Sequence, residues 1–445
     1  MTGPPTPRRQ PSPLDRRRFL RLAGMTGAGL GLSGALSGCN VLGLGDTSTA
    51  PKGRTITLGF VTPQSGQLAA FGEADNYVLN GLRERLADGL QIGATAYPVD
   101  IVVGDSQSDP ERAQQVAKDL ITGKQVDMML VASTPDITNP VASLCEATGV
   151  PCISTIASWQ TWFFGRKGNP DKPFKWTFHF FWGLEDAIRV YTDMWGQIPN
   201  NKLVGALWPN DAPGKAWSDG KRGFPATLRP DGYKIIDPGR YEGQSSDFTP
   251  QLEMFRDSGA DILTGVPTPA DMATIWKQAH DVGYRPRIVT AGRAPLFPAF
   301  IEAMSPNAEG LSTELWWSPS YPFRSSLTGQ TATELGADYT RRTDRQWTQP
   351  LGFVHALFEV AMRVLQVAGN PDDKTAIAEA ARTLVLDTVV GHLDFNRGPV
   401  PGVAKTPLSG GQWRRGGDFP FEIVVVSSVD PAIQSLGDLR PILSF

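Results

Sequence analysis

The residue types that most often carry chemistry are spread thinly along this chain. The four histidines are His179, His280, His355 and His392. No pair of them has the helical spacing of a metal site. Asp105 and Asp109 resemble a pair of catalytic carboxylates, but Asp109 before Pro110 is better explained as a helix N-cap. No phosphate loop, dinucleotide fingerprint or Gly-x-Ser-x-Gly elbow follows a predicted strand. We therefore expect no enzyme, no metal site and no cofactor.

Two cysteines, Cys145 and Cys152, lie in the body of the chain. They are seven positions apart and have no histidine near them, so they do not make a zinc site. In an oxidising compartment they could form a disulfide, and the alternative is a pair of buried thiols. The sequence leaves these alternatives open.

The N-terminal stretch carries two motifs in order. Residues 15–21, Asp-Arg-Arg-Arg-Phe-Leu-Arg, resemble a twin-arginine export signal. The Gly/Ala/Leu run that follows is too short and too rich in glycine for a permanent membrane span. Residues 36–39, Leu-Ser-Gly-Cys, then resemble a bacterial lipobox, whose cysteine becomes the lipidated N-terminus. We predict that residues 1–38 are a signal peptide, that Cys39 carries the lipid, and that residues 39–53 are a flexible tether.

The lipid would hold the folded part on the outer face of the cytoplasmic membrane, since several acyl chains together make a stable anchor. The 445-residue chain is 40% hydrophobic and 20% charged, as in ordinary globular proteins. Residues 1–38 carry six arginines and one aspartate, a charge of +5, so the formal charge of −3 leaves −8 for the rest. This acidic balance argues against a nucleic-acid binder. No later segment has about eighteen uninterrupted apolar residues, so we expect no transmembrane helix.

Strands alternate with helices through most of the chain beyond the tether. Apolar, β-branched runs predict the strands, and apolar residues at helical spacing predict the helices. The first set has strands at 55–61, 100–103, 128–131 and 151–154, and helices at 71–87, 110–122 and 139–147. The second set has strands at 203–207, 233–236, 261–265 and 287–290, and helices at 214–228, 250–258 and 269–282. This alternation predicts an α/β fold of two doubly wound lobes, each a parallel sheet covered on both faces.

The last third of the chain does not predict a third lobe. It has an extended segment at 309–317, a long helix at 351–368 and strands at 389–395 and 421–426. We expect the chain to cross back to the first lobe at 315–317 and to return to the second at 389–394, so that three crossings form a hinge. The expected lobes are 54–178 with 316–388, and 179–315 with 389–445.

Several short motifs lie at the ends of these elements. They are Gly-Phe-Val-Thr-Pro-Gln-Ser-Gly at 59–66, Phe-Gly-Glu at 71–73, the stretch 105–110, Thr-Gly-Val-Pro-Cys-Ile-Ser at 148–154, and Ala-His-Asp-Val-Gly-Tyr at 279–284. Together with the order of elements they resemble the type I periplasmic-binding fold, over about residues 54–394. The chain is similar to the branched-chain amino acid and amide receptors of ABC importers. The resemblance implies two lobes that close on a small molecule, and a permease and ATPase complex that reads the closed form.

Strand ends provide the candidates for the ligand site, because ligands of open α/β sheets bind beyond the carboxyl ends of the strands. From the first lobe they are Gln64, Ser65, Phe71, Ser133, Thr134, Ile156, Ala157 and Ser158. From the second lobe they are Asn210, Asp211, Thr268 and Arg293. The resemblance implies an aromatic contact at Phe71, a ligand-binding carbonyl at Ile156 and a ligand-binding hydroxyl at Ser158.

One departure from the amino-acid receptors concerns the ligand's ammonium group. Those receptors hold it with a tyrosine after the strand at 203–207 and an acid after the strand at 287–290. This chain has Pro213 and Gly292-Arg293 at those places, which argues against an α-amino acid ligand. Arg293 would suit a carboxylate through its planar fork of donors, and the alternative is a surface ion pair.

A second departure is the number of tryptophans at predicted loop ends and crossings. They are Trp159, Trp162, Trp182, Trp208, Trp316 and Trp317. Aromatic rings in a cleft stack on flat or cationic ligands, and the alternative is that they fill the hinge and the lobe interface. We choose Trp182 and Trp316 as cleft candidates, which favours a ligand with a planar part.

These expectations combine into one hypothesis about function. The chain is a lipid-anchored substrate-binding protein of an ABC importer, exported to the outer face of the cytoplasmic membrane. Its ligand is a small polar organic solute, such as an amino acid-like compound, an amide or a carboxylate. The alternative is a ligand-sensing receptor of a signalling system with the same fold, because either partner could read the closure of the lobes.

Overall fold

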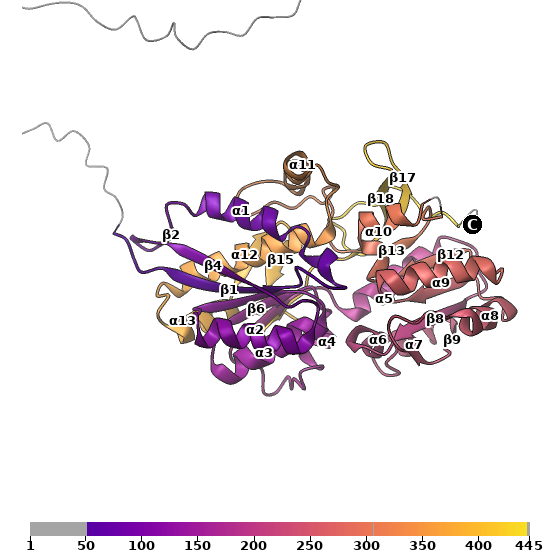
Figure 1. Ribbon diagram of the computed structural model, residues 1–445, viewed down its shortest axis with the longest axis horizontal. Helices are drawn as coiled ribbons and strands as arrows, with labels where there is room; N and C mark the ends of the chain where they lie inside the picture. The colour runs from indigo at the N-terminus through magenta and orange to yellow at the C-terminus, as the bar shows by residue number, and fades with distance from the viewer. Residues whose placement is uncertain (1–50, 306, 443–445) are drawn as a thin grey trace, which may run out of the picture. The chain divides into compact units, whose positions relative to one another are not determined.

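Two mainly parallel sheets organise the part of the chain that the structure describes, residues 51–305 and 307–442 of this computed structural model (Figure 1). The predicted signal peptide, Cys39 and most of the predicted tether lie outside the described residues. The described part confirms the α/β fold of parallel strands and covering helices that the alternating pattern predicts.

The first sheet has six strands in the order β16-β7-β6-β5-β1-β4. These strands are β1 (Ile56–Thr62), β4 (Val99–Asp105), β5 (Met128–Ala132), β6 (Cys152–Thr155), β7 (Thr177–Phe180) and β16 (Val403–Ala404). All neighbouring strands in it are parallel. β5 is buried at every position, as expected for a central strand of a sheet that is covered on both faces.

Helices cover both faces of the first sheet. One face carries α1 (Asp75–Arg85) and α12 (Gln349–Ala368), and the other carries α2 (Pro110–Thr122) and α3 (Pro135–Thr148). Leu58 and Phe60 of β1 pack with the first pair, and Val61 packs with the second. Within the described residues α12 alone is long and apolar enough to span a membrane, but 78% of that stretch is buried inside the fold. It is therefore a core helix.

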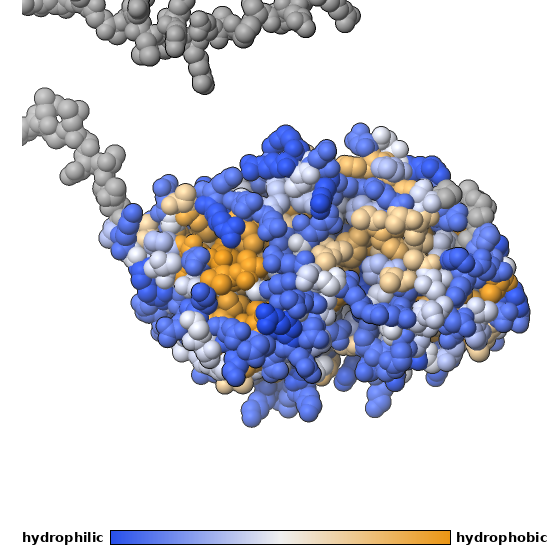
Figure 2. All heavy atoms as spheres, in the orientation of Figure 1, coloured by the Kyte–Doolittle hydropathy of each residue, from blue (hydrophilic) through white to orange (hydrophobic). Residues whose placement is uncertain are grey.

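Smaller elements complete the first half. They are the 3-10 turn η1 (Ala69–Gly72), the helices α4 (Trp159–Phe163), α11 (Ala332–Thr343) and α13 (Lys374–Arg382), and two hairpins, β2 (Leu90–Ile92) with β3 (Thr95–Tyr97) and β14 (Val385–Thr388) with β15 (Gly391–Asp394). β4 forms one edge of the sheet, and its Val99, Val102 and Val103 are only half-buried. Figure 2 shows an apolar area over this region, and a second, paler apolar area around α10 and β13 on the same face.

The second sheet has eight strands in the order β10-β8-β11-β12-β13-β17-β18, with β9 beside β8. They are β8 (Leu203–Pro209), β9 (Lys234–Ile236), β10 (Arg240–Tyr241), β11 (Ile262–Gly265), β12 (Ile288–Ala291), β13 (Ser312–Leu315), β17 (Ser409–Arg415) and β18 (Phe421–Ser428). β17 pairs antiparallel with both β13 and β18, whereas the other pairs are parallel. The helices around it are α5 (Leu184–Gly196), α6 (Ala212–Trp217), α7 (Phe224–Leu228), α8 (Thr249–Asp257), α9 (Pro269–Asp281) and α10 (Pro298–Ala303), with the 3-10 turn η2 (Ala294–Leu296).

Some elements differ from those expected. The helix expected at 214–228 is two short helices, because the Asp219 carboxylate accepts the main-chain N–H groups of Lys221 and Arg222 and forms a turn between them. The helices α4, α5, α10, α11 and α13 were not predicted from the sequence. The strand β17 was not predicted either, because Ser409-Gly410-Gly411 has the composition of a loop and becomes a strand only through pairing on both sides.

The described chain passes between the sheets after β7, after β13 and after β16. The second crossing starts at the expected place, because β13 ends at Leu315. The return expected at 389–394 is wrong, since β15 pairs with β14 and β16 still pairs with β7 of the first sheet. The chain returns only after Ala404. The expected boundary at residue 178 also falls inside β7.

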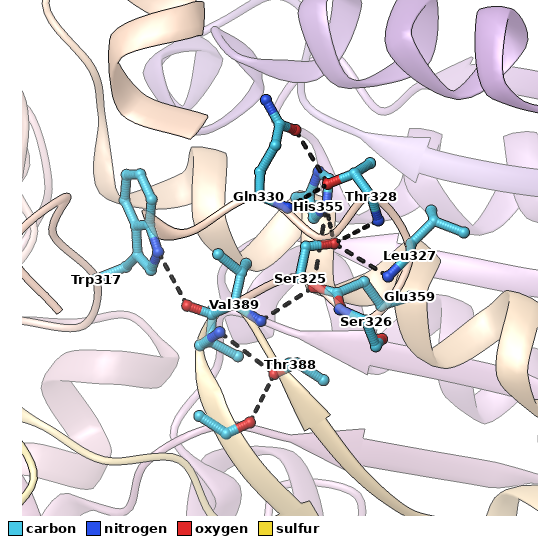
Figure 3. Close-up of polar contacts among 12 residues, drawn as sticks. Trp317, Ser325, Ser326, Leu327, Thr328, Gln330, His355, Glu359, Thr388 and Val389 are labelled. Carbon is cyan, nitrogen blue, oxygen red and sulfur yellow. Dashed lines mark hydrogen bonds and ion pairs between the residues drawn. The ribbon is translucent and has the colours of Figure 1, made fainter. Parts of the chain in front are cut away.

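A network of hydrogen bonds connects α12 to the chain that follows the second crossing (Figure 3). The Glu359 carboxylate accepts the main-chain N–H of Val389 at 3.1 Å and the hydroxyl of Ser326 at 2.6 Å. Nε2 of His355 contacts Ser325 Oγ at 2.8 Å and Glu359 Oε1 at 3.9 Å. A catalytic triad would need the carboxylate on the opposite ring nitrogen, so this arrangement is structural. Burial lowers the pKa of His355 to about 4 and raises that of Glu359 to about 7.

Cys145 on α3 and Cys152 on β6 are both buried and both free thiols. A hydrogen bond that the Cys145 thiol makes to the Cys152 side chain, together with burial, raises the pKa of Cys145. Of the two alternatives for these residues, the structure therefore has the pair of buried thiols.

Candidate functional site

A pocket lies between the two sheets, beyond the carboxyl ends of their parallel strands. It holds about 430 Å³ of space outside the atoms, including its open mouth. Eight predicted site residues line it: Phe71, Thr134, Ile156, Ala157, Ser158, Trp182, Arg293 and Trp316. The other residues that line it were not predicted as site residues: Pro135, Thr161, Phe181, Pro213, Trp217, Val266, Leu296 and Glu314.

Three predicted residues of the first half do not line the pocket. Gln64 and Ser65 are exposed, and their main-chain N–H groups donate to Asp105 Oδ1 at 2.9 and 3.3 Å. Ser133 is buried, and its carbonyl accepts the Thr138 hydroxyl at 2.8 Å. These contacts stabilise the loops after β1 and β5 and leave the residues outside the pocket wall.

Three predicted residues of the second half also stay outside the wall. Asn210 donates to Glu242 Oε1 at 2.7 Å. Thr268 is the N-cap of α9, where its hydroxyl accepts the main-chain N–H of Asp271 at 3.3 Å. Asp211 is the N-cap of α6 and reaches the pocket only through Arg293. Helix caps follow strands directly in this fold. Residues chosen because they lie at strand ends therefore include helix caps as well as ligand contacts.

Two residues of the pocket wall have strained backbones. Ile156, after β6, has a φ of 69°, which is rare for a β-branched residue. Arg293, after β12, has φ 64° and ψ −64°, and the N–H of Ala294 donates to the Gly292 carbonyl at 2.7 Å. This is a tight γ-turn of the strained kind. The surrounding fold must hold both residues in place, and such strain collects at ligand clamps and active sites.

Arg293 forms a buried ion pair and not the surface pair of the sequence analysis. Its two terminal nitrogens both donate to Asp211 Oδ2 at 2.8 Å, and its side chain is 6% exposed. Asp211 Oδ1 accepts the N–H of Gly214, which fixes the carboxylate at the start of α6. The N–H of Ala212 donates at 3.4 Å to Asp136 on α3, which links the two halves. Burial, and then the charge of Asp211, raises the pKa of Asp136.

Aromatic side chains form much of the wall. Phe71 and Trp316 lie nearly parallel, with ring centroids 6.2 Å apart and 16° between their planes. Phe181 packs on Trp316 at 5.1 Å and on Trp182 at 4.8 Å. Of the other candidate tryptophans, Trp162, Trp208 and Trp317 are fully buried. They fill the interior of the fold, which is the alternative to a place in the cleft.

The hydrogen bonds within the pocket wall determine which donors and acceptors remain available to a ligand. The Thr161 hydroxyl donates to the Ser158 carbonyl at 2.6 Å, so in the 2.9 Å contact between the two hydroxyls Ser158 is the donor. Ser158 Oγ therefore keeps only acceptor capacity for a ligand. Within the described residues the indole N–H groups of Trp182 and Trp316 and the hydroxyl of Thr134 are buried without a partner. Unpaired buried groups are costly, so these three suit a polar ligand.

Among the pocket residues that sequence reasoning missed, Glu314 is the one with an ionisable side chain. It lies on β13, is 2% exposed, and its Oε2 accepts the Tyr191 hydroxyl at 2.5 Å and the Thr313 hydroxyl at 3.0 Å. Burial raises its pKa to about 7, against the lowering effect of these hydrogen bonds and of the Arg293 main-chain N–H. The available signal in the sequence was an acid directly before the apolar run Leu315-Trp316-Trp317.

The two walls of the pocket touch each other at its margins. Phe71 packs edge-on against Phe297, which precedes α10, with ring centroids 4.9 Å apart. The guanidinium of Arg222, between α6 and α7, lies 4.0 Å from the ring centroid of Phe164, which follows α4. Each contact joins one half of the molecule to the other.

Solved structures with this fold cover most of the chain. A leucine binding protein from Thermotoga maritima is 17% identical, with a TM-score of 0.68, over 84% of this chain and 99% of that chain. A solute binding protein of an ABC transporter from Rhodopseudomonas palustris, in complex with 3,4-dihydroxybenzoic acid, is 16% identical with a TM-score of 0.68, over 86% and 99%. A branched-chain amino acid transporter substrate binding protein from Streptococcus pneumoniae, in complex with isoleucine, is 16% identical with a TM-score of 0.66, over 83% and 99%.

These likenesses show a type I periplasmic-binding fold, with two doubly wound lobes joined by three crossings. No curated protein sequence matches the chain. A family model described as "Periplasmic binding protein" matches residues 55–418, and the family and its structural neighbours are substrate-binding proteins and not enzymes. The chain belongs to the periplasmic binding protein family.

Proposed function

We propose that this protein is an exported substrate-binding protein of an ABC importer, and that the pocket between its lobes holds the transported solute. The observation that carries the proposal is the pocket wall. It is built from the carboxyl ends of strands in both sheets, and it contains strained residues from each half, Ile156 and Arg293. A site between two lobes can bind by closure, which removes water from the ligand and strengthens each polar contact.

The wall supports a small organic solute with a planar or apolar body and a polar end. The aromatic rings offer a flat apolar surface, and the unpaired indole N–H groups and Thr134 hydroxyl offer donors. The structural neighbours include a leucine binding protein and a protein in complex with 3,4-dihydroxybenzoic acid. We therefore place the ligand among amino acid-like compounds, amides and carboxylates. The partners are a permease and an ATPase, and a lipid on Cys39 keeps the protein at the membrane.

Mass spectrometry of the molecules released when the purified protein is denatured tests this proposal. A small polar organic compound, present at about one per chain, is the expected result. Stoichiometric release of a metal ion or a nucleotide, or a protein that carries and binds no small molecule, would overturn it. The intact mass of protein extracted from membranes tests the anchor, because lipidation adds acyl chains to a chain that starts at Cys39.

A further inference from the structure

In the part of the chain that the structure describes, the pocket wall has one ionisable side chain with an oppositely charged partner and one without such a partner. Of the described residues that line it, Arg293 and Glu314 are the only two with ionisable side chains. The charge of Arg293 is neutralised by Asp211, which takes both of its terminal nitrogens. Among the described residues, Glu314 has as partners the hydroxyls of Tyr191 and Thr313 and the main-chain N–H groups of Arg293 and of Glu314 itself. When Glu314 ionises, its negative charge is the uncompensated charge of the pocket wall.

No charged side chain from the neighbouring elements offsets Glu314 within the described residues. Tyr191 on α5 is the titratable group in contact with it, and Arg293 before η2 contacts it through the main chain. Its register partner on β17 is Gly410, and the flanking strand β12 has no titratable residue. Oε2 accepts both of these hydroxyl hydrogen bonds.

We infer that Glu314 receives a cationic group of the ligand, so that the occupant is an organic ammonium compound with an apolar or aromatic body. The inference rests on the proposed solute-binding function and specifies the ligand class for the same pocket. The acid that would hold an amino group is missing after β12, where Arg293 lies. Glu314, on the next strand of the sheet, β13, takes that role instead.

Three further observations support a cation over an anion. Phe71, Phe181, Trp182, Trp217 and Trp316 line the pocket, and the faces of such rings attract a cation. Ser158 Oγ can only accept, so it suits an N–H donor. A ligand that carries only a negative charge would meet an uncompensated carboxylate and an arginine that is already paired. The unpaired indole N–H groups remain available to a neutral or acidic second group of the ligand.

Calorimetry with three matched probes tests this inference: phenethylammonium, 3-phenylpropionate and phenylalanine. We expect both ammonium compounds to bind, and 3-phenylpropionate to bind at least about tenfold more weakly, the scale of one charge contact. The pKa of Glu314 is about 7, so a cation bound beside it should release protons at pH 7, seen as a binding enthalpy that differs between phosphate and Tris buffers. Its ionised fraction rises from roughly one tenth to nine tenths between pH 6 and pH 8, so affinity should rise up to roughly tenfold.

Two variants and one control variant separate this role from a structural one. Glu314→Gln should abolish proton release and weaken phenethylammonium binding by at least about 30-fold, the usual effect of removing one partner of a buried charge pair. Glu359→Gln is the matched control, because Glu359 is equally buried, also has a pKa of about 7, and lies outside the pocket. Tyr191→Phe removes a hydrogen bond that lowers the pKa of Glu314, so the pH at which affinity is half-maximal should shift upward.

Three outcomes would overturn the inference. One is tighter binding of 3-phenylpropionate with proton uptake, which would leave the solute-binding function standing. Another is unchanged affinity in Glu314→Gln. The third is that neither ammonium compound binds, in which case the released-ligand measurement decides the solute-binding function separately.

Discussion

Asp75 shows how burial changes the chemistry of a single carboxyl group in this fold. It is fully buried, its Oδ2 accepts the Thr62 hydroxyl at 2.7 Å, and its Oδ1 has no partner among the described residues. Burial raises its pKa from 3.8 to about 7. Below pH 3.8 both the folded and unfolded chains keep this proton. Between pH 3.8 and 7 the unfolded chain loses it first, so the contribution of Asp75 to stability is lost as pH rises.

The Asp75→Asn variant tests whether Asp75 makes the fold less stable as pH rises. The amide cannot ionise, so the variant should gain stability relative to wild type as pH rises, by about 2 to 3 kcal/mol between pH 5 and pH 8. Urea unfolding at the two pH values measures the change. The exposed residue Asp88, in Asp88→Asn, is the control and should keep the wild-type pH profile. Parallel profiles for wild type and Asp75→Asn would show that Asp75 does not carry this pH dependence.

At the scale of elements, α12 shows packing overriding helix propensity. Glycine is a poor helix residue, but Gly352 lies in the first turn of α12 and packs on Trp317 at the second crossing. A Cβ at Gly352 would lie 2.3 Å from Cγ of Trp317. The indole N–H of Trp317 in turn donates to the Val389 carbonyl at 3.1 Å (Figure 3). The helix therefore leaves room for the ring that fixes the crossing.

Gly352→Ala should destabilise the fold by about 1–3 kcal/mol, because overpacking outweighs the gain in helix propensity. Gly81 on α1 is the matched control, since its Cβ would meet nothing within 4 Å. Gly81→Ala should stabilise by up to about 1 kcal/mol. Urea midpoints of the two variants measure the contrast, and equal shifts would mean that the Trp317 contact does not limit this position.

At the scale of the whole molecule, the lobes touch on two sides of the pocket. The Arg222–Phe164 contact joins α6–α7 to the segment after α4, and the Phe71–Phe297 contact lies in the pocket region itself. Closure around a ligand is a shift between populations, so a contact made only in the closed form adds to the apparent affinity. Arg222 is exposed and outside the pocket wall, which makes it a test of closure alone.

Arg222→Ala should weaken binding of the released ligand about two- to fivefold, the scale of an exposed cation–π contact. The melting temperature of the ligand-free protein should stay unchanged. Lys221→Ala, one residue earlier, is the control. Small-angle scattering with and without ligand should show a smaller particle when the ligand is bound. Unchanged affinity in Arg222→Ala would remove this contact from the closure mechanism.

The alternation of elements could be predicted from local signals, because buried parallel strands and amphipathic helices leave clear patterns in a sequence. The strand at 55–61 and the N-cap Asp109, whose carboxylate accepts the N–H of Arg112 at 2.7 Å, are examples. Elements made by long-range pairing could not be predicted in the same way. Ser409-Gly410-Gly411 becomes a strand only between β13 and β18, and β16 is fixed by β7.

The sequence alone determined the fold class, the strand ends from which the pocket wall is built, and residues such as Phe71, Ile156 and Arg293 that line it, since parallel strands bring their carboxyl ends to one edge. Only the tertiary structure decided which polar groups are already satisfied. Arg293 is paired with Asp211, far away in sequence, and Glu314 comes to the pocket because a strand of the second sheet ends there. Pairing and burial set the charge that a ligand meets, and both depend on contacts between distant parts of the chain.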